Sequence, residues 1–144
     1  MQEAIKATIR RARPDDLARI EHLLAASALP LDGVSEALNG FSVAEENGSI
    51  VGVVAVENCG DYGLLRSAAV ESSARNHGIG RRLVEQAIEN ARANRTKSLY
   101  LLTTTAEKYF PLFGFETVTR ESVPDSIRGT VEFREACPAS ATVM

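Results

Sequence analysis

The 144-residue sequence predicts a mixed α/β domain in which helices cover one β-sheet. Apolar residues recur with the strand period in several short runs and with the helix period over two longer stretches. Read in chain order, these segments predict the succession β-α-β-β-β-α-β-α-β-β. The sequence contains no internal repeat, low-complexity run or linker, so we expect a single domain over residues 1–144.

The composition is that of a soluble globular protein, with 44% hydrophobic and 24% charged residues. A formal net charge of −3 argues against a nucleic-acid partner. The sequence carries neither a signal peptide nor an apolar run of about 20 residues, so we expect a cytoplasmic protein without a membrane partner. Cys59 and Cys137 lack metal-ligand spacing. We expect two reduced, packed thiols and no metal, with an arsenic(III) site as the alternative.

The first segments predict a strand followed by a helix. Residues Ile5–Ala12 alternate like a strand. Pro14-Asp15-Asp16 then favours a helix start, because proline suits the first turn and acidic groups oppose the helix dipole. A further short helical turn is expected at Ser35–Leu38. One face of the first helix is traced by Leu17, Ile20, Leu23, Leu24 and Ser27.

A β-hairpin is the clearest element of the sequence. Asn47-Gly48 is a preferred two-residue turn, and it separates Phe41–Glu46 from Ser49–Glu57. The run Ile50–Val56 is too uniformly apolar for a strand with one solvated face, so we expect it inside the sheet. Another turn leads to the strand Leu64–Val70, which is the fourth of the chain.

The second half begins with an amphipathic helix over Arg81–Ala93, whose apolar stripe faces away from charged residues. Gly114 predicts the end of a later short helix, which Pro111 restricts in length. After the amphipathic helix we expect a buried strand at Ser98–Thr104, and then this short helix at Ala106–Phe113. A strand at Glu116–Arg120, a turn or short helix at 124–127 and a last strand at Val131–Phe133 follow.

The turn between the fourth strand and the amphipathic helix predicts an anion site. It reads Arg75-Asn76-His77-Gly78-Ile79-Gly80. Its glycines let the backbone approach a ligand closely, and successive N–H groups at a helix start bind phosphate. Arg75, Arg81 and Arg82 add positive charge. We therefore expect a phosphate-bearing ligand, held mainly by backbone.

This element order, with Arg-x-x-Gly-x-Gly after the fourth strand and Gly114-Phe115 after a short helix, resembles the GCN5-related N-acetyltransferase (GNAT) superfamily over nearly the whole chain. Within it, the sequence is most similar to the arsenic-resistance-associated N-acetyltransferases of the arsinothricin N-acetyltransferase type. It also resembles the acetyltransferase domain of N-acetylglutamate synthases. The subgroup resemblance rests on Leu29-Pro30 with Gly33-Val34, Phe41-x-Val43-Ala44-Glu45, Leu64-Leu65-Arg66-Ser67 with Ala69-Val70, Leu99 to Ala106, Arg120-x-x-Val123-Pro124, and Glu132-Phe133 with Cys137-Pro138-x-Ser140-Ala141.

The resemblance implies an acetyl-CoA-dependent N-acetyltransferase in which an amine attacks the thioester directly. It implies a sheet splayed between the fourth and fifth strands, with the pantetheine arm paired to the backbone near Ala69 and Val70. The Val70 N–H would donate to the thioester oxygen. The coenzyme would further contact Arg75, Asn76, His77, Gly78, Ile79, Gly80, Arg81, Thr103 and Phe110. Superfamily members are often dimers, so a homodimer is a candidate assembly.

The general base and acid are less defined. A base must take a proton from the amine. Glu45 is the first candidate because its neighbours match the subgroup, and Glu57, Glu71 and a water chain are alternatives. Many superfamily members carry a tyrosine general acid four residues before Gly-Phe, where this chain has Phe110. Tyr109 lies beside it but about 100° around a helix. A thiolate also leaves well without an acid.

Arg66 is the sharpest candidate for substrate binding. It interrupts an apolar strand, and a buried arginine needs a partner. A substrate carboxylate or an arsenic or phosphorus oxyanion would supply one; an internal salt bridge or a solvent-facing position is the alternative. Ser67 and Thr104 could add hydroxyl donors. We expect acetylation of arsinothricin, together with its analogue phosphinothricin. Acetylation of glutamate or a related metabolite and a non-catalytic acyl-CoA or amino-acid sensing module are the alternatives.

Overall fold

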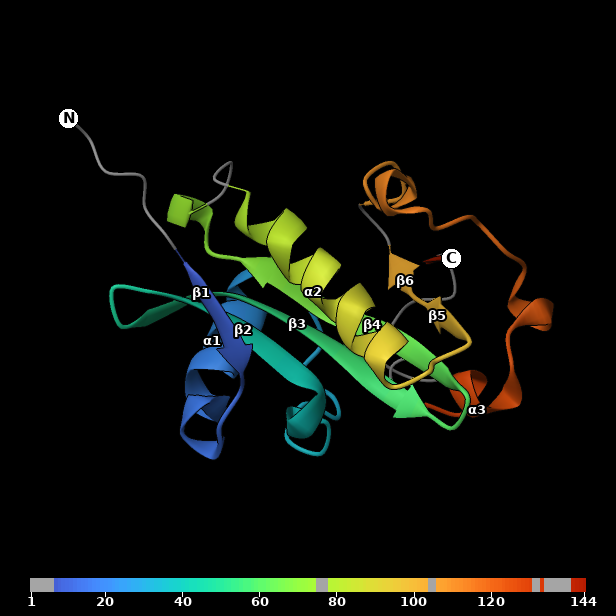
Figure 1. Cartoon of the computed structure of the whole chain (residues 1–144), viewed down its shortest axis with the longest axis horizontal. Coiled ribbons are helices and arrows are strands. Elements are labelled where there is room, and N and C mark those ends of the chain that lie inside the picture. The colour runs from blue at the N-terminus through green and yellow to red at the C-terminus, as the bar shows by residue number, and fades with distance from the viewer. Residues whose placement is uncertain (1–6, 75–77, 104–105, 131–132, 134–140) are drawn as a thin grey trace.

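A computed structural model describes residues 7–74, 78–103, 106–130, 133 and 141–144. Its centre is a five-stranded sheet in the order β1-β2-β3-β4-β5 (Figure 1). Strands β1 to β4 pair with one another in antiparallel fashion, whereas β4 and β5 pair in parallel, so the sheet is mixed as predicted. The strands are β1 (Thr8–Arg11), β2 (Phe41–Glu46), β3 (Ser49–Cys59), β4 (Tyr62–Val70) and β5 (Ser98–Tyr100).

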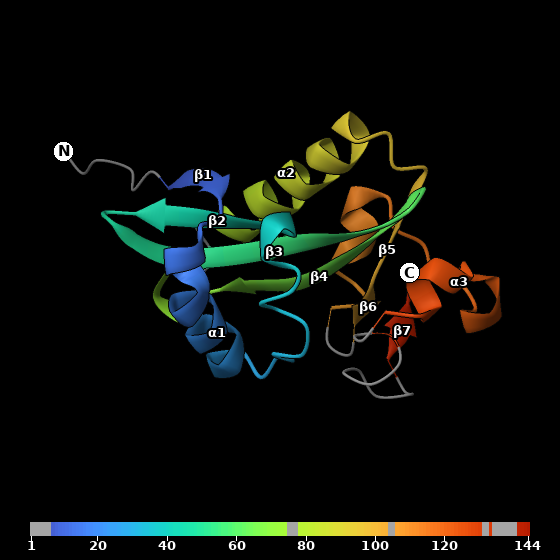
Figure 2. The same ribbon diagram turned by 90° about the horizontal axis from the view of Figure 1, so that it is seen from below.

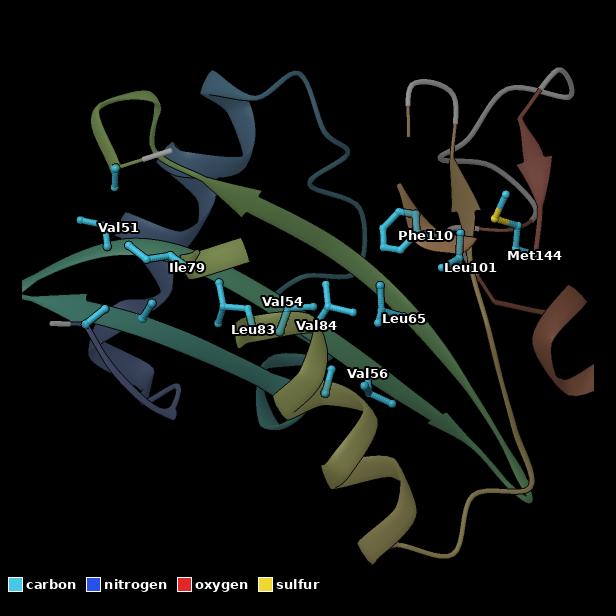
Figure 3. Close-up of a cluster of buried hydrophobic side chains, with 14 residues drawn as sticks. Val51, Val54, Val56, Leu65, Ile79, Leu83, Val84, Leu101, Phe110 and Met144 are labelled. Atoms are coloured by element: carbon cyan, nitrogen blue, oxygen red, sulfur yellow. The ribbon is translucent and has the colours of Figure 1, made fainter. Parts of the chain in front are cut away.

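Two helices cover opposite faces of this sheet (Figure 2). The helix α1 (Leu17–Ala26) follows a 3-10 turn at Pro14–Asp16, and α2 (Ile79–Ala93) follows β4. Each helix buries its apolar stripe in a separate hydrophobic cluster, so the predicted helix faces are confirmed. Figure 3 shows the cluster under α2, where side chains of β3 and β4 meet those of the helix.

The predicted hairpin is present and places β3 at the centre of the sheet. Asn47 and Gly48 both adopt positive φ, 52° and 81°, as a primed two-residue turn requires. All seven residues of Ile50–Val56 are buried, because β3 has a strand on each side and a helix on each face. The uniformly apolar run was therefore interpreted correctly.

The β4 and β5 strands separate after a short stretch of pairing. Tyr62–Leu64 pairs with Ser98–Tyr100, and the chain then leaves the sheet. The next strand, β6 (Leu102–Thr103), pairs with β7 (Thr142–Val143) in a second, two-stranded sheet. The single strand predicted over 98–104 is therefore wrong in part: it is two short strands in different sheets. This separation is the predicted splay.

Other predictions for the last third need correction. Only Phe110–Phe113 of the predicted helix 106–113 is helical, as a 3-10 turn that contains Pro111. No strand forms over Glu116–Arg120, where one backbone bond, from Val118 N to Val143 O, joins the segment to β7. The short helix expected near 124–127 is present as α3 (Asp125–Arg128).

Two short elements also differ from the prediction. Instead of a turn of helix at 35–38, a 3-10 turn spans Leu38–Gly40. The strand expected at 131–133 falls largely outside the described residues. Among the helices that the structure describes, none has the length and apolar character needed to span a bilayer.

Candidate active site

A β-bulge distorts β4 where it faces β3. Arg66 pairs with Ala55 and Ala69 pairs with Val53, so Ser67 and Ala68 together face a single residue of β3. Ser67 takes a left-handed conformation with φ 58°, which is uncommon for a residue with a side chain. The extra residue exchanges the two faces of the strand. Beyond it, Ala69 packs in the α1-side cluster and Val70 packs on the α2 side.

The bulge and the two residues after it lie on the part of β4 that has left β5, whose last pair is Leu64 with Tyr100. The structure therefore brings Ala69 and Val70 to the opening between the diverging strands. This is where the sequence places the pantetheine arm and the donor to the thioester oxygen.

The first turn of α2 lies against the end of β4. Gly78 precedes the helix with φ 78°, and the backbone N–H of Arg82 donates to the Gly78 carbonyl at 3.1 Å. A methyl group built on Gly80 would lie 3.5 Å from Val70 Cγ2. The helix comes this close partly because Gly52 of β3 has no side chain: a Cβ there would be 2.8 Å from Leu83 Cδ1.

Part of the predicted phosphate turn cannot be placed. Arg75, Asn76 and His77 lie outside the described residues, and so does Thr104. The helix begins two residues earlier than predicted, because Gly78 is its N-cap and Ile79, Gly80 and Arg81 form its first turn. The Arg81 side chain is exposed, with Nε 3.2 Å from Glu85 Oε2, so its charge lies at the surface of the first turn.

Two of the predicted coenzyme contacts, Thr103 and Phe110, lie in β6 and in the segment after it. Thr103 Oγ1 accepts a hydrogen bond from the Ala106 N–H at 2.9 Å. Phe110 is buried in the α2-side cluster. Its ring meets Tyr109 and Phe115 edge to face, with centroids 5.4 and 5.8 Å away. A buried phenyl ring occupies the position where many superfamily members have tyrosine.

Arg66 points to the opposite face, toward the loop that follows α1. Its side chain is only 1% exposed, and Nη2 donates to the Asp32 carbonyl at 2.6 Å. Nε donates to Ser67 Oγ at 3.0 Å, and Nη1 lies 3.5 Å from Glu57 Oε1. The internal salt bridge that the sequence left open as an alternative is present. Arg66 also fastens the 31–34 loop to the strand beside the bulge.

All three glutamates considered as bases are paired with an arginine. Glu45 Oε1 lies 2.7 Å from Arg10 Nε, which ties β2 to β1. Glu71 Oε2 lies 2.9 Å from Arg19 Nη2 of α1. Glu57, paired with Arg66, is the candidate beside the buried cation, and its side chain remains 28% exposed.

The described cysteine is a protonated thiol. Cys59 Sγ donates to the Glu57 carbonyl at 3.6 Å, and burial raises the pKa of Cys59 to about 11. Cys137 lies outside the described residues. Among the residues that the structure describes, no three His, Cys, Asp or Glu side chains gather as a metal site would require.

Sequence reasoning missed two features of the site. The left-handed Ser67 had no signal in the sequence, because serine does not favour positive φ as glycine does. The role of the Asp32 carbonyl was missed because a backbone acceptor carries no residue signature. The pairing of Glu57 with Arg66 could have been found by aligning β3 with β4 as a hairpin, because Glu57 lies opposite Leu64 and Arg66 is two residues further along β4, before the bulge.

A mixed sheet that splays next to a glycine-rich helix start defines the fold class of coenzyme-A-dependent acetyltransferases, and a family model agrees. Residues 37–117, more than half of the chain, match the acetyltransferase (GNAT) domain. The chain therefore belongs to the GNAT acetyltransferase family. This confirms the GNAT superfamily that the sequence resembles.

Known proteins similar to this chain include amino-acid acetyltransferases. The one from Mycobacterium tuberculosis H37Rv is 30% identical over 123 residues, which cover 78% of this chain and 70% of that protein. The one from Neisseria meningitidis is 29% identical over 93 residues, or 63% of this chain, but only 21% of its own length is covered. The chain thus spans about a fifth of the Neisseria protein.

Solved structures show the same fold. Rv2747 from Mycobacterium tuberculosis, solved with CoA, superposes with a TM-score of 0.78 at 27% identity, over 95% of this chain and 96% of that one. N-acetylglutamate synthase from Neisseria gonorrhoeae, solved with coenzyme A and L-arginine, gives a TM-score of 0.80 at 26% identity. That match covers 98% of this chain and 33% of the synthase.

Proposed function

We propose that this protein transfers the acetyl group of acetyl-CoA to the α-amino group of a small acidic amino acid. One observation carries the substrate class. A buried arginine, Arg66, lies immediately before the bulge, three residues from Ala69 and four from Val70. Its donors contact the Asp32 carbonyl, Ser67 Oγ and Glu57, so in this proposal a substrate carboxylate replaces Glu57 as the charged partner, because a charged pair with two hydrogen bonds gives both affinity and orientation. The similarity to amino-acid acetyltransferases supports the same class.

The proposed mechanism gives each of the predicted site residues a role. In this proposal the pyrophosphate of acetyl-CoA binds the backbone N–H groups of the 75–80 turn, with Arg81 beside it. The substrate nitrogen attacks the thioester carbon at the opening between β4 and β5. The Val70 N–H donates to the oxygen that becomes negative. The carbon–sulfur bond then breaks, and the electron pair leaves with the sulfur.

A base must remove a proton from the amine. Glu45 is our first candidate, on its resemblance to the subgroup, and Glu57 is the candidate nearest to Arg66, at 3.5 Å. Substituting Glu45, Glu57 and Glu71 individually by glutamine tests this choice. The variant that lacks the true base should have a kcat about 100-fold lower, within the usual range for acid–base catalysis, and its pH profile of kcat should lose the acidic limb. A water chain predicts that none of the three does so.

Within this class we propose arsinothricin as the preferred substrate, with phosphinothricin accepted as its analogue. This finer assignment rests on the motifs shared with the arsenic-resistance-associated enzymes, such as Leu64-Leu65-Arg66-Ser67. Glutamate is the alternative, and it is favoured by the similarity to amino-acid acetyltransferases. A homodimer and a cytoplasmic location remain predictions from the sequence.

A thiol-release assay decides the function. Purified protein is mixed with acetyl-CoA and each of arsinothricin, phosphinothricin, L-glutamate and 4-aminobutyrate, which lacks an α-carboxylate. We expect release with the first three and little with the last, and the highest kcat/KM with arsinothricin. Coenzyme binding without release on any amine would instead favour the sensing module. A preference for L-glutamate would overturn the arsinothricin assignment alone.

A further inference from the structure

Tyr109 is the feature that the proposed mechanism leaves unused. Its hydroxyl lies over the first turn of α2, 3.7 Å from the point where a Gly80 Cβ would be. The same point is 3.5 Å from Val70 Cγ2. The tyrosine hydroxyl and the end of β4 therefore both lie next to Gly80 at the start of the helix.

The protein holds the Tyr109 ring in place from both sides. It packs edge to face with Phe110 and Phe113, whose centroids are 5.4 and 5.2 Å away. The Tyr109 N–H donates to the Ala106 carbonyl at 3.0 Å, and Ala106 is itself fixed by Thr103. The ring is thus positioned before any ligand binds, so little side-chain entropy would be lost on contact.

The hydroxyl is also in the right state to donate. Partial burial raises the pKa of Tyr109, with Arg81 opposing this effect and Glu85 adding to it. The phenol therefore keeps its proton throughout the neutral range. The side chain is 37% exposed, so a ligand can reach it.

We propose that the Tyr109 hydroxyl is a positioning group for the coenzyme and donates a hydrogen bond to a pyrophosphate oxygen of acetyl-CoA. The inference rests on the proposed function, which places the pyrophosphate at this helix start. A phosphate oxygen is the expected acceptor because the hydroxyl faces Gly80 and lies close enough to Arg81 to feel its charge. A hydrogen bond to a charged acceptor is about twice as strong as a neutral one.

The test compares Tyr109→Phe with the parent protein in calorimetric titrations with coenzyme A and with pantetheine, which lacks the phosphates. We expect the variant to bind coenzyme A about 10-fold more weakly, in line with loss of one hydrogen bond to a charged group. Its affinity for pantetheine and its kcat at saturating acetyl-CoA should be unchanged. Tyr100→Phe, on β5, is the matched control and should alter neither ligand's affinity.

Two results would overturn the inference. Unchanged affinity for coenzyme A in Tyr109→Phe would show that the hydroxyl makes no such contact. A fall in kcat with unchanged coenzyme affinity would assign the hydroxyl to the leaving sulfur instead. Failure of the proposed function looks different, because the parent protein itself would then bind coenzyme A without acetylating any amine, or would not bind it.

Discussion

Replacing Arg66 by methionine should destabilise the fold by about 3 kcal/mol. The change keeps a long apolar stem but removes every donor of a side chain that is 1% exposed. Breaking a buried ion pair from one side costs about 3–5 kcal/mol, and an unsatisfied buried acceptor such as the Asp32 carbonyl costs about 1–3 kcal/mol. We take the low end of the first range because Glu57, at 28% exposure, can turn to water.

Urea denaturation at 25 °C, followed by far-UV circular dichroism, measures this change in the free energy of unfolding. Arg66→Lys is the control: it keeps the charge and should lose less stability than methionine. A loss below about 1 kcal/mol for Arg66→Met would refute the reasoning, since it would mean that the guanidinium contributes no more than a surface ion pair.

A double-mutant cycle separates the ion pair from the carbonyl contact. Glu57→Gln alone should cost about 1.5–3 kcal/mol, because it leaves the buried Arg66 cation facing an uncharged amide instead of a carboxylate. In the Arg66→Met background the same change should be neutral or stabilising, because it removes a carboxylate without a counterion. Additive effects would show that the two side chains do not interact. The substrate KM of any Arg66 variant is interpretable only after its folding has been measured this way.

Three further predictions concern single residues. Gly80→Leu should abolish measurable coenzyme A binding in calorimetry, because the leucine side chain fills the space before Val70. Its melting temperature should be unchanged or higher, because leucine favours helix over glycine by roughly 0.8 kcal/mol. Gly80→Ala, whose methyl group meets only ordinary contacts, is the control, and equal coenzyme A binding by both variants would contradict the prediction. In a Cys137→Ser background, Cys59 should react with iodoacetamide at pH 7.5 roughly 100-fold more slowly than a free thiol. Its pKa is raised from 9.0 to about 11, so a smaller fraction of the thiol is ionised. A rate equal to that of free cysteine would be inconsistent with a buried thiol. Asp16→Asn should lower the free energy of unfolding at neutral pH, and the difference from the parent protein should shrink below pH 3.8. The reason is that Arg10 lowers the pKa of folded Asp16, and this stabilisation is lost as pH falls through the lowered value. A difference that stayed constant in urea titrations at several pH values would exclude this role of Asp16.

The elements that were predicted correctly depend on local chemistry. Asn47-Gly48 specifies its turn through backbone preference, and the run Ile50–Val56 specifies a central strand through uniform burial. The apolar stripe of α2 is equally self-contained. In each case the residues that form the element also carry the signal for it.

The elements that were missed depend on distant parts of the chain. The apolar run 98–104 looks continuous, but Leu101 exchanges backbone hydrogen bonds with Met144, more than 40 residues away, and the strand changes sheet there. Likewise Arg66 stood out as a charge in an apolar strand, whereas its partner Glu57 follows from the register between β3 and β4. Periodicity within one segment does not report such pairings.

The bulge at Ser67 gives one strand two independent surfaces. Before it, the side chain of Arg66 belongs to the loop after α1; after it, Val70 belongs to α2. Under the proposed function, the residues that select the amine can therefore vary without moving the backbone that meets the thioester. A single-residue deletion at the bulge would end this independence, because it would restore plain alternation and turn Ala69 and Val70 to the opposite faces. Substrate range can thus diverge by substitution along β4, while the length of the strand is constrained by the chemistry it supports.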